Sequence, residues 1–221
     1  LDEWQAGIGS DLAAAIVMDP NSGEILAMDT TTRYNLNDPY NLSTYYTDEE
    51  IQAMDEKAKS EAWYKMWRNF CVSDTFEPGS TIKPFTVATG LEIGALKGDE
   101  TYYCGGSLQI DEWEIKCISY DNGGHGQQNL TQVMENSCNV ALMQIGLAIG
   151  PEEFCKYQSI FGFGQYTGID LPGEAVGILQ SPDGMIKTDL ATNSFGQNFN
   201  VTMLQLATGF SSLINGGDYY E

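Results

Sequence analysis

The feature that most constrains this chain is a serine followed three residues later by a lysine, Ser80 and Lys83, within residues 77–85. A serine hydroxyl is almost never ionised at neutral pH, so it becomes a nucleophile only with a base within hydrogen-bond reach. Residues three apart share one face of a helix, so Lys83 can be that base. Gly79 allows a sharp approach to the helix, and Pro84 is tolerated only in its first turn. Taken alone, the pair could also be a helix start with an exposed lysine.

A second motif, Ser137 and Asn139 separated by one residue, occurs once in the chain. It lies between residues 130–136, which we expect to form a short helix, and the apolar run 140–149. Side chains at such a turn can project into a cleft. The alternative is an ordinary helix–helix turn in which Asn139 is the N-cap of the second helix.

Together with several other segments, these motifs resemble the transpeptidase domain of class B penicillin-binding proteins of the cell-division or sporulation type. The matches run in order along nearly the whole chain, which is far more specific than either motif alone. The matching segments are residues 14–20, 23–28, 67–69, 73–80, 124–126, 137–140, 161–164, 168–174 and 194–197.

The resemblance implies one α/β domain over residues 1–221 with the penicillin-binding and serine β-lactamase-like fold, a helical cluster packed on an antiparallel sheet. Periodicity and breakers predict the elements that belong to it. We expect strands at 13–19 and 24–29, a hairpin within 102–118, and helices at 48–67, 81–92, 130–136, 140–148, 151–161 and 201–214.

One departure concerns the family's third motif, Lys-Thr-Gly or Lys-Ser-Gly on a core strand. The nearest match, Lys187-Thr188-Asp189, comes too early, before the segment at 194–197. We therefore expect the C-terminal strands to be missing from this chain. Without them one apolar edge of the 13–29 hairpin would be unpaired, so we expect a continuation of the chain or a second polypeptide to supply them.

The resemblance also implies the activity, a D,D-transpeptidase that cross-links peptidoglycan stem peptides and is acylated by β-lactams. Its catalytic residues would be Ser80, Lys83, Ser137 and Asn139, with Ser80 and Asn139 also binding substrate. This chemistry needs no metal or organic cofactor. The alternatives are a β-lactamase or β-lactam sensor of the same fold, and a non-catalytic scaffold in a cell-wall synthesis complex.

Charge and hydropathy limit the partners. With 31 acidic and 10 basic residues the net charge is −21, which argues against nucleic acid and against an anionic membrane surface. No apolar run is long enough to cross a bilayer. The resemblance implies an anchor and a pedestal domain upstream of Leu1, action on the outer face of the bacterial cytoplasmic membrane, and glycosyltransferase and divisome-type partners.

Five cysteines leave at least one thiol unpaired in an exported protein. Cys104 and Cys117 flank the predicted hairpin, where they could form a disulfide or remain buried thiols. A third possibility is a structural zinc ion held by Cys104, Cys117, Asp121 and His125. The spacing of these four residues is no strong zinc signature.

Overall fold

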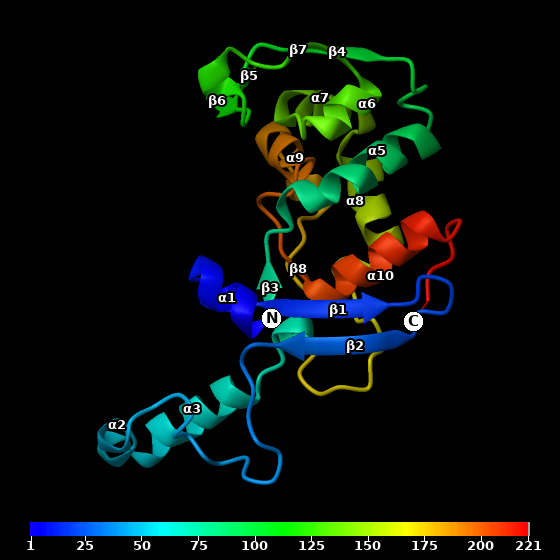
Figure 1. The fold of residues 1–221 in the computed structure, drawn as a ribbon. Helices are drawn as coiled ribbons and strands as arrows, with labels where there is room; N and C mark the ends of the chain where they lie inside the picture. The colour runs from blue at the N-terminus through cyan, green and yellow to red at the C-terminus, as the bar shows by residue number, and fades with distance from the viewer. Residues whose placement is uncertain (221) are drawn as a thin grey trace.

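The computed structural model describes residues 1–220 of the chain, which form a hairpin, a helical lobe and a projecting helical pair (Figure 1). The helices are α1 (Asp2–Ile8), α2 (Asp48–Ala53), α3 (Glu56–Trp67), α4 (Phe70–Ser73), α5 (Lys83–Glu92), α6 (Leu130–Glu135), α7 (Asn139–Ile149), α8 (Pro151–Ile160), α9 (Lys187–Asn193) and α10 (Met203–Ile214). The strands are β1 (Ala14–Met18), β2 (Ile25–Thr30), β3 (Thr75–Phe76), β4 (Thr101–Cys104), β5 (Ser107–Ile110), β6 (Trp113–Lys116), β7 (Gly126–Asn129) and β8 (Val201–Thr202).

The β1–β2 hairpin confirms the two strands expected near the start of the chain, and it packs against α4 and α10. Ile16 and Met18 alternate along β1 and pack against a buried cluster that includes Leu204 of α10, whereas Val17 between them is exposed. This alternation is the side-chain period of a strand. Among residues 1–220 the hairpin remains a two-stranded sheet.

The helical lobe is built around α7, which contacts α5, α8, α9 and the small strands β4 to β6. α7 is apolar on nearly every side, with Val140, Leu142 and Ile145 at 1 % exposure or less, as expected for a helix surrounded by other elements. Its central position brings its first residue next to the first residue of α5. The Ser-x-x-Lys and Ser-x-Asn motifs meet at this junction.

Two predicted elements differ in the structure. The helix expected at 48–67 is split, because Asp55 accepts a hydrogen bond from the Ala58 N–H and so caps a new helix, α3. The predicted hairpin comprises only β5 and β6, whereas β4 pairs with β7. Cys104 on β4 is therefore not in the same ladder as the segment leading to Cys117.

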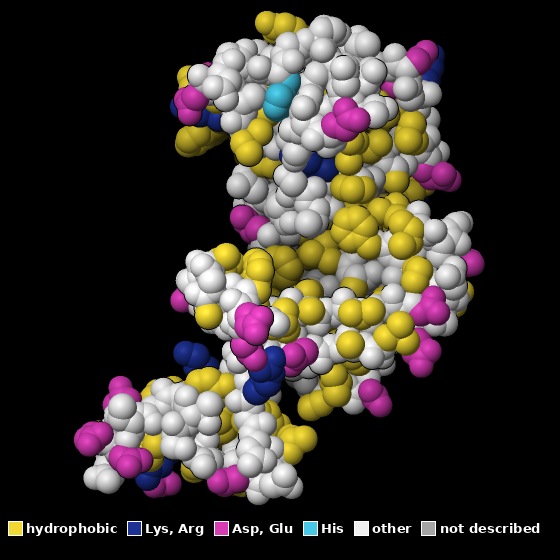
Figure 2. All heavy atoms as spheres, in the orientation of Figure 1, with side chains coloured by type: hydrophobic (Ala, Val, Ile, Leu, Met, Phe, Trp, Pro, Cys, Tyr) yellow, Lys and Arg dark blue, Asp and Glu magenta, His cyan; other side chains and the backbone are white. Residues whose placement is uncertain are grey.

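Acidic side chains are spread over the visible face of the molecule, including the projecting α2–α3 pair (Figure 2). Within residues 1–220, none of the helices has both the length and the hydropathy needed to span a bilayer.

Candidate active site

Ser80 lies in a 3-10 helix, Gly79–Ile82, that runs directly into α5 at Lys83. This geometry has three residues per turn, so the side chains of Ser80 and Lys83 project from the same side. Gly79 at the start of the turn has a φ of +55°, a backbone conformation that favours glycine. Ser80 is exposed, whereas Lys83 is only 2 % exposed.

Lys83 is held by the Ser-x-Asn motif at the junction of α6 and α7. Its Nζ donates hydrogen bonds to the Ser137 carbonyl oxygen at 2.7 Å, to Ser137 Oγ at 2.8 Å and to Asn139 Oδ1 at 2.7 Å. Ser137 Oγ in turn donates to Ser80 Oγ at 3.0 Å. The structure therefore brings together all four residues that the sequence singled out, in a chain of hydrogen bonds from Ser80 through Ser137 to Lys83.

The protonation of Lys83 is set by its surroundings. Burial lowers the pKa of the amine to about 8, and negative charge on the nearby sulfurs of Cys117 and Cys138 partly opposes this shift. Within residues 1–220 no carboxylate pairs with Lys83, since the six ion pairs involve other side chains. A neutral amine, able to accept a proton, is therefore accessible near physiological pH.

The turn that carries Ser137 has an unusual backbone. Ser137 has a φ of +49°, which costs free energy for a residue with a side chain and persists only where the surroundings enforce it. The next residue, Cys138, is completely buried, and its N–H donates to the Val133 carbonyl at 3.0 Å. The buried cysteine thus anchors the strained turn on which Ser137 and Asn139 project.

The loop after α9 fixes the other side of the nucleophile. Gly79 N–H donates to the Gly196 carbonyl at 2.8 Å, and Asn198 N–H donates to Glu77 Oε1 at 2.8 Å. Gly196 has a φ of +96° and lies against the Gly79 backbone. The sequence marked this segment only as a match to a family, and its close contact with Gly79 was not predicted.

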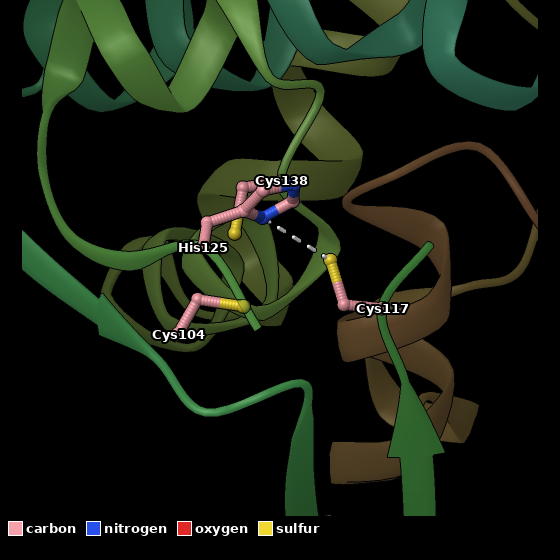
Figure 3. Close-up of side chains that lie close together, drawn as sticks. All are labelled: Cys104, Cys117, His125 and Cys138. Atoms are coloured by element: carbon pink, nitrogen blue, oxygen red, sulfur yellow. Dashed lines mark hydrogen bonds between the residues drawn. The ribbon is translucent and has the colours of Figure 1, made fainter. Parts of the chain in front are cut away.

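The residues expected to bind zinc are regrouped in the structure. Cys104, Cys117 and His125 lie together, but the fourth member is Cys138, and the ligand atoms of these four are all within 4.8 Å of one another (Figure 3). Asp121 is exposed and outside this group, so the structure does not bring it together with the other three expected ligands. All the cysteines are free thiols, so no Cys104–Cys117 disulfide is present.

The Cys117 sulfur is surrounded by hydrogen-bond donors. Burial alone would raise the pKa of this thiol, but the Ser119 backbone and hydroxyl and the backbone N–H groups of Val140 and Asn139 lower it to about 6. Burial raises the pKa of Cys138 to about 11. One buried sulfur is thus prepared to carry negative charge while its neighbour stays protonated, as expected for two close thiols.

Comparisons of the sequence with known proteins identify the same family that the two motifs resemble. The family model of the penicillin binding protein transpeptidase domain matches residues 13–221. The chain is 36% identical to stage V sporulation protein D of Bacillus subtilis over its whole length, and 31% identical to the peptidoglycan D,D-transpeptidase FtsI of Escherichia coli over 95% of it. It spans only 31% and 32% of the length of these relatives.

A solved structure gives the same fold. The transpeptidase domain of penicillin-binding protein 3 from Burkholderia pseudomallei superimposes with a TM-score of 0.78 at 24% identity, covering 99% of this chain and 55% of that one. The expected fold class is therefore confirmed.

Proposed function

The chain belongs to the penicillin-binding protein transpeptidase domain family, and on that premise we propose that it forms the acyl-transfer site of a D,D-transpeptidase acting on peptidoglycan stem peptides. The observation that carries the proposal is the hydrogen-bonded chain from Ser80 Oγ through Ser137 Oγ to Lys83 Nζ. A relative at 31% identity is named as a peptidoglycan D,D-transpeptidase, which supports the same reaction. The four residues act as follows.

In the first step, Ser80 Oγ attacks the carbonyl carbon between the two terminal D-alanines. Its proton passes to Ser137 Oγ as the Ser137 proton passes to neutral Lys83, so one C–O bond forms and an oxyanion develops. The backbone N–H of Ser80 is one donor for this oxyanion. The proton then returns through Ser137 to the leaving nitrogen, the C–N bond breaks, and D-alanine departs.

In the second step, an amine from a neighbouring stem peptide attacks the acyl-enzyme ester. The amine gives up a proton through Ser137 to neutral Lys83 as the new C–N bond forms. The Ser80 ester bond then breaks, and the proton returns through Ser137 to Ser80 Oγ. Asn139 holds Lys83 through Oδ1 and binds the substrate amide through Nδ2. A β-lactam enters the same route, but its opened ring keeps the leaving nitrogen tethered, so the ester persists. We further propose that the site works on the outer face of the bacterial cytoplasmic membrane, together with a glycosyltransferase that supplies the glycan strands.

The proposal is tested by intact-mass spectrometry of the whole protein before and after benzylpenicillin, followed by peptide mapping. We expect one long-lived penicilloyl group on the peptide that contains Ser80. Rapid return to the unmodified mass, with steady hydrolysis of a cephalosporin, would instead identify a β-lactamase. A protein that forms no adduct would be a scaffold without this chemistry.

The rate of acylation is expected to depend on pH through Lys83. Because the pKa of this amine is about 8, the neutral fraction, and with it the second-order rate constant, should rise about tenfold per unit between about pH 6 and 7 and level off above about 8. Stopped-flow measurement with a fluorescent penicillin checks this. Lys187 is exposed and begins α9, so Lys187→Ala is the control and should keep the same profile. A flat profile from about pH 6 to 9 would contradict the assigned role of Lys83.

A further inference from the structure

A compact group of soft metal ligands lies directly behind the Ser-x-Asn turn. The three sulfurs of Cys104, Cys117 and Cys138 and a ring nitrogen of His125 lie within 4.8 Å of one another (Figure 3). Cys117 Sγ is 3.7 Å from His125 Nδ1. His125 is the only histidine in the chain, and none of the four takes part in the acyl transfer described above.

The separations fit a tetrahedral metal ion. Bonds of about 2.3 Å to sulfur and about 2.0 Å to nitrogen put tetrahedral ligand atoms roughly 3.5 to 3.8 Å apart. The Cys117–His125 pair already has this separation, and the widest pair needs to close by about 1 Å. Three cysteines and one histidine form a complete structural zinc set with no open position. Sulfur and imidazole ligands in this geometry favour zinc over magnesium or calcium, which prefer oxygen.

The group could instead be three cysteines buried as small apolar side chains, because all three belong to the apolar core around α7. The polar groups around them argue against this. His125 Nδ1 is directed at Cys117 and is also 3.2 Å from Ser119 Oγ, which lies 3.8 Å from Cys104 Sγ. Donors of this kind around a sulfur are the usual second shell of a metal-bound thiolate.

We propose that Cys104, Cys117, His125 and Cys138 bind one structural zinc ion, and that this ion fixes the turn that positions Ser137 and Asn139. The ligands come from four segments: the end of β4, the residue after β6, the residue before β7, and the α6–α7 turn. Zinc would join the small strands to the residue between Ser137 and Asn139. The left-handed backbone of Ser137 would then be held by a metal bond as well as by packing.

The location outside the cytoplasm, which rests on the proposed function, also favours a metal site at these cysteines. Outside the cytoplasm, closely spaced thiols tend to be oxidised to disulfides, yet all three are free here. Zinc binding would keep them as thiolates. An access route exists, because His125 is only partly buried and its ring shows at the surface of the helical lobe (Figure 2).

The first test measures metal content, which does not depend on activity. The whole protein, purified without chelator, should contain about one zinc ion per chain by elemental mass spectrometry. Cys117→Ser and His125→Ala should lose most of it. Cys155→Ser should keep it, since Cys155 is a half-buried cysteine that donates to the Gln180 carbonyl outside the group. Cobalt(II) added to the metal-stripped protein should give the absorption bands of a tetrahedral thiolate site. A protein that lacks zinc and also fails to bind zinc or cobalt would overturn the proposal.

The second test separates positioning of the turn from general stabilisation. Penicillin acylation is followed on stripped protein that still has its native circular dichroism, recording both the rate constant and the final extent of labelling. We expect a rate constant at least about tenfold lower with full extent, restored by added zinc in the unaltered protein but not in Cys138→Ser. A lower extent with an unchanged rate constant would mean that zinc only supports folding, and would overturn the positioning role. Zinc bound to a protein that never acylates would refute the proposed function and leave the metal site standing.

Discussion

A Lys83→Met variant is expected to form its penicilloyl adduct about a thousandfold more slowly than the unaltered protein. Methionine fills nearly the same buried volume but cannot accept a proton. The Ser80 hydroxyl then has no base at the end of its hydrogen-bond chain, and Ser137 Oγ loses the donor that lies 2.8 Å away. The measurement is the initial rate of adduct formation by intact mass at about pH 8.

Two further variants calibrate this result. Ser80→Ala removes the proposed nucleophile and gives the background rate, with no adduct expected at any time. Lys156→Met alters an exposed lysine that pairs with Glu153 at 2.8 Å on α8, and it should acylate at the normal rate. If Lys83→Met acylated as fast as Lys156→Met, another group would have to be the base, and the assignment of Lys83 would be wrong.

The close approach of the four proposed acyl-transfer residues could be predicted from sequence, because a serine and its base must lie within hydrogen-bond reach. A serine and a lysine three apart share a face in an α-helix and in a 3-10 helix, so the error of two residues in the start of α5 did not matter. The turn at the Ser-x-Asn motif was predictable because the apolar run that follows it marks the start of a buried helix. This helix, α7, begins at Asn139.

The members of the proposed zinc site could be predicted only in part, because distance along the sequence does not report which segments meet in the fold. Asp121, one of the four expected ligands, lies exposed in the 3-10 helix Tyr120–Asn122. Cys138 lies 13 residues beyond His125 in sequence. It reaches the group because β4 pairs with β7 and α7 packs against β4. Its position inside the Ser-x-Asn motif, just before an apolar helix, indicated burial, and that signal was missed.

Gly196→Ala is expected to lower both the free energy of unfolding and the rate of acylation. A Cβ there would lie 1.9 Å from the Gly79 carbonyl oxygen and 2.4 Å from its carbon, and the backbone φ of +96° is itself unfavourable for alanine. The clash and the strain together should lower the free energy of unfolding by on the order of 3 kcal/mol. The Gly79 N–H bond to Gly196 would also be displaced, and with it the turn that presents Ser80.

Gly216→Ala is the matched control, because Gly216 has a φ of +100° but nothing within 4 Å of an added Cβ. This variant measures only the loss of unfolding free energy caused by alanine in a left-handed backbone, on the order of 1 kcal/mol. It should leave acylation unchanged. Urea unfolding gives the stabilities, and the rate of penicilloyl formation reports the nucleophile. Equal losses of stability in the two variants, with normal acylation in Gly196→Ala, would show that the Gly196 loop yields without moving Gly79. A larger loss of stability in Gly196→Ala than in Gly216→Ala, together with slow acylation, would establish that the loop after α9 holds Ser80 in place. It would do so through contact between the Gly196 and Gly79 backbones rather than through a side chain.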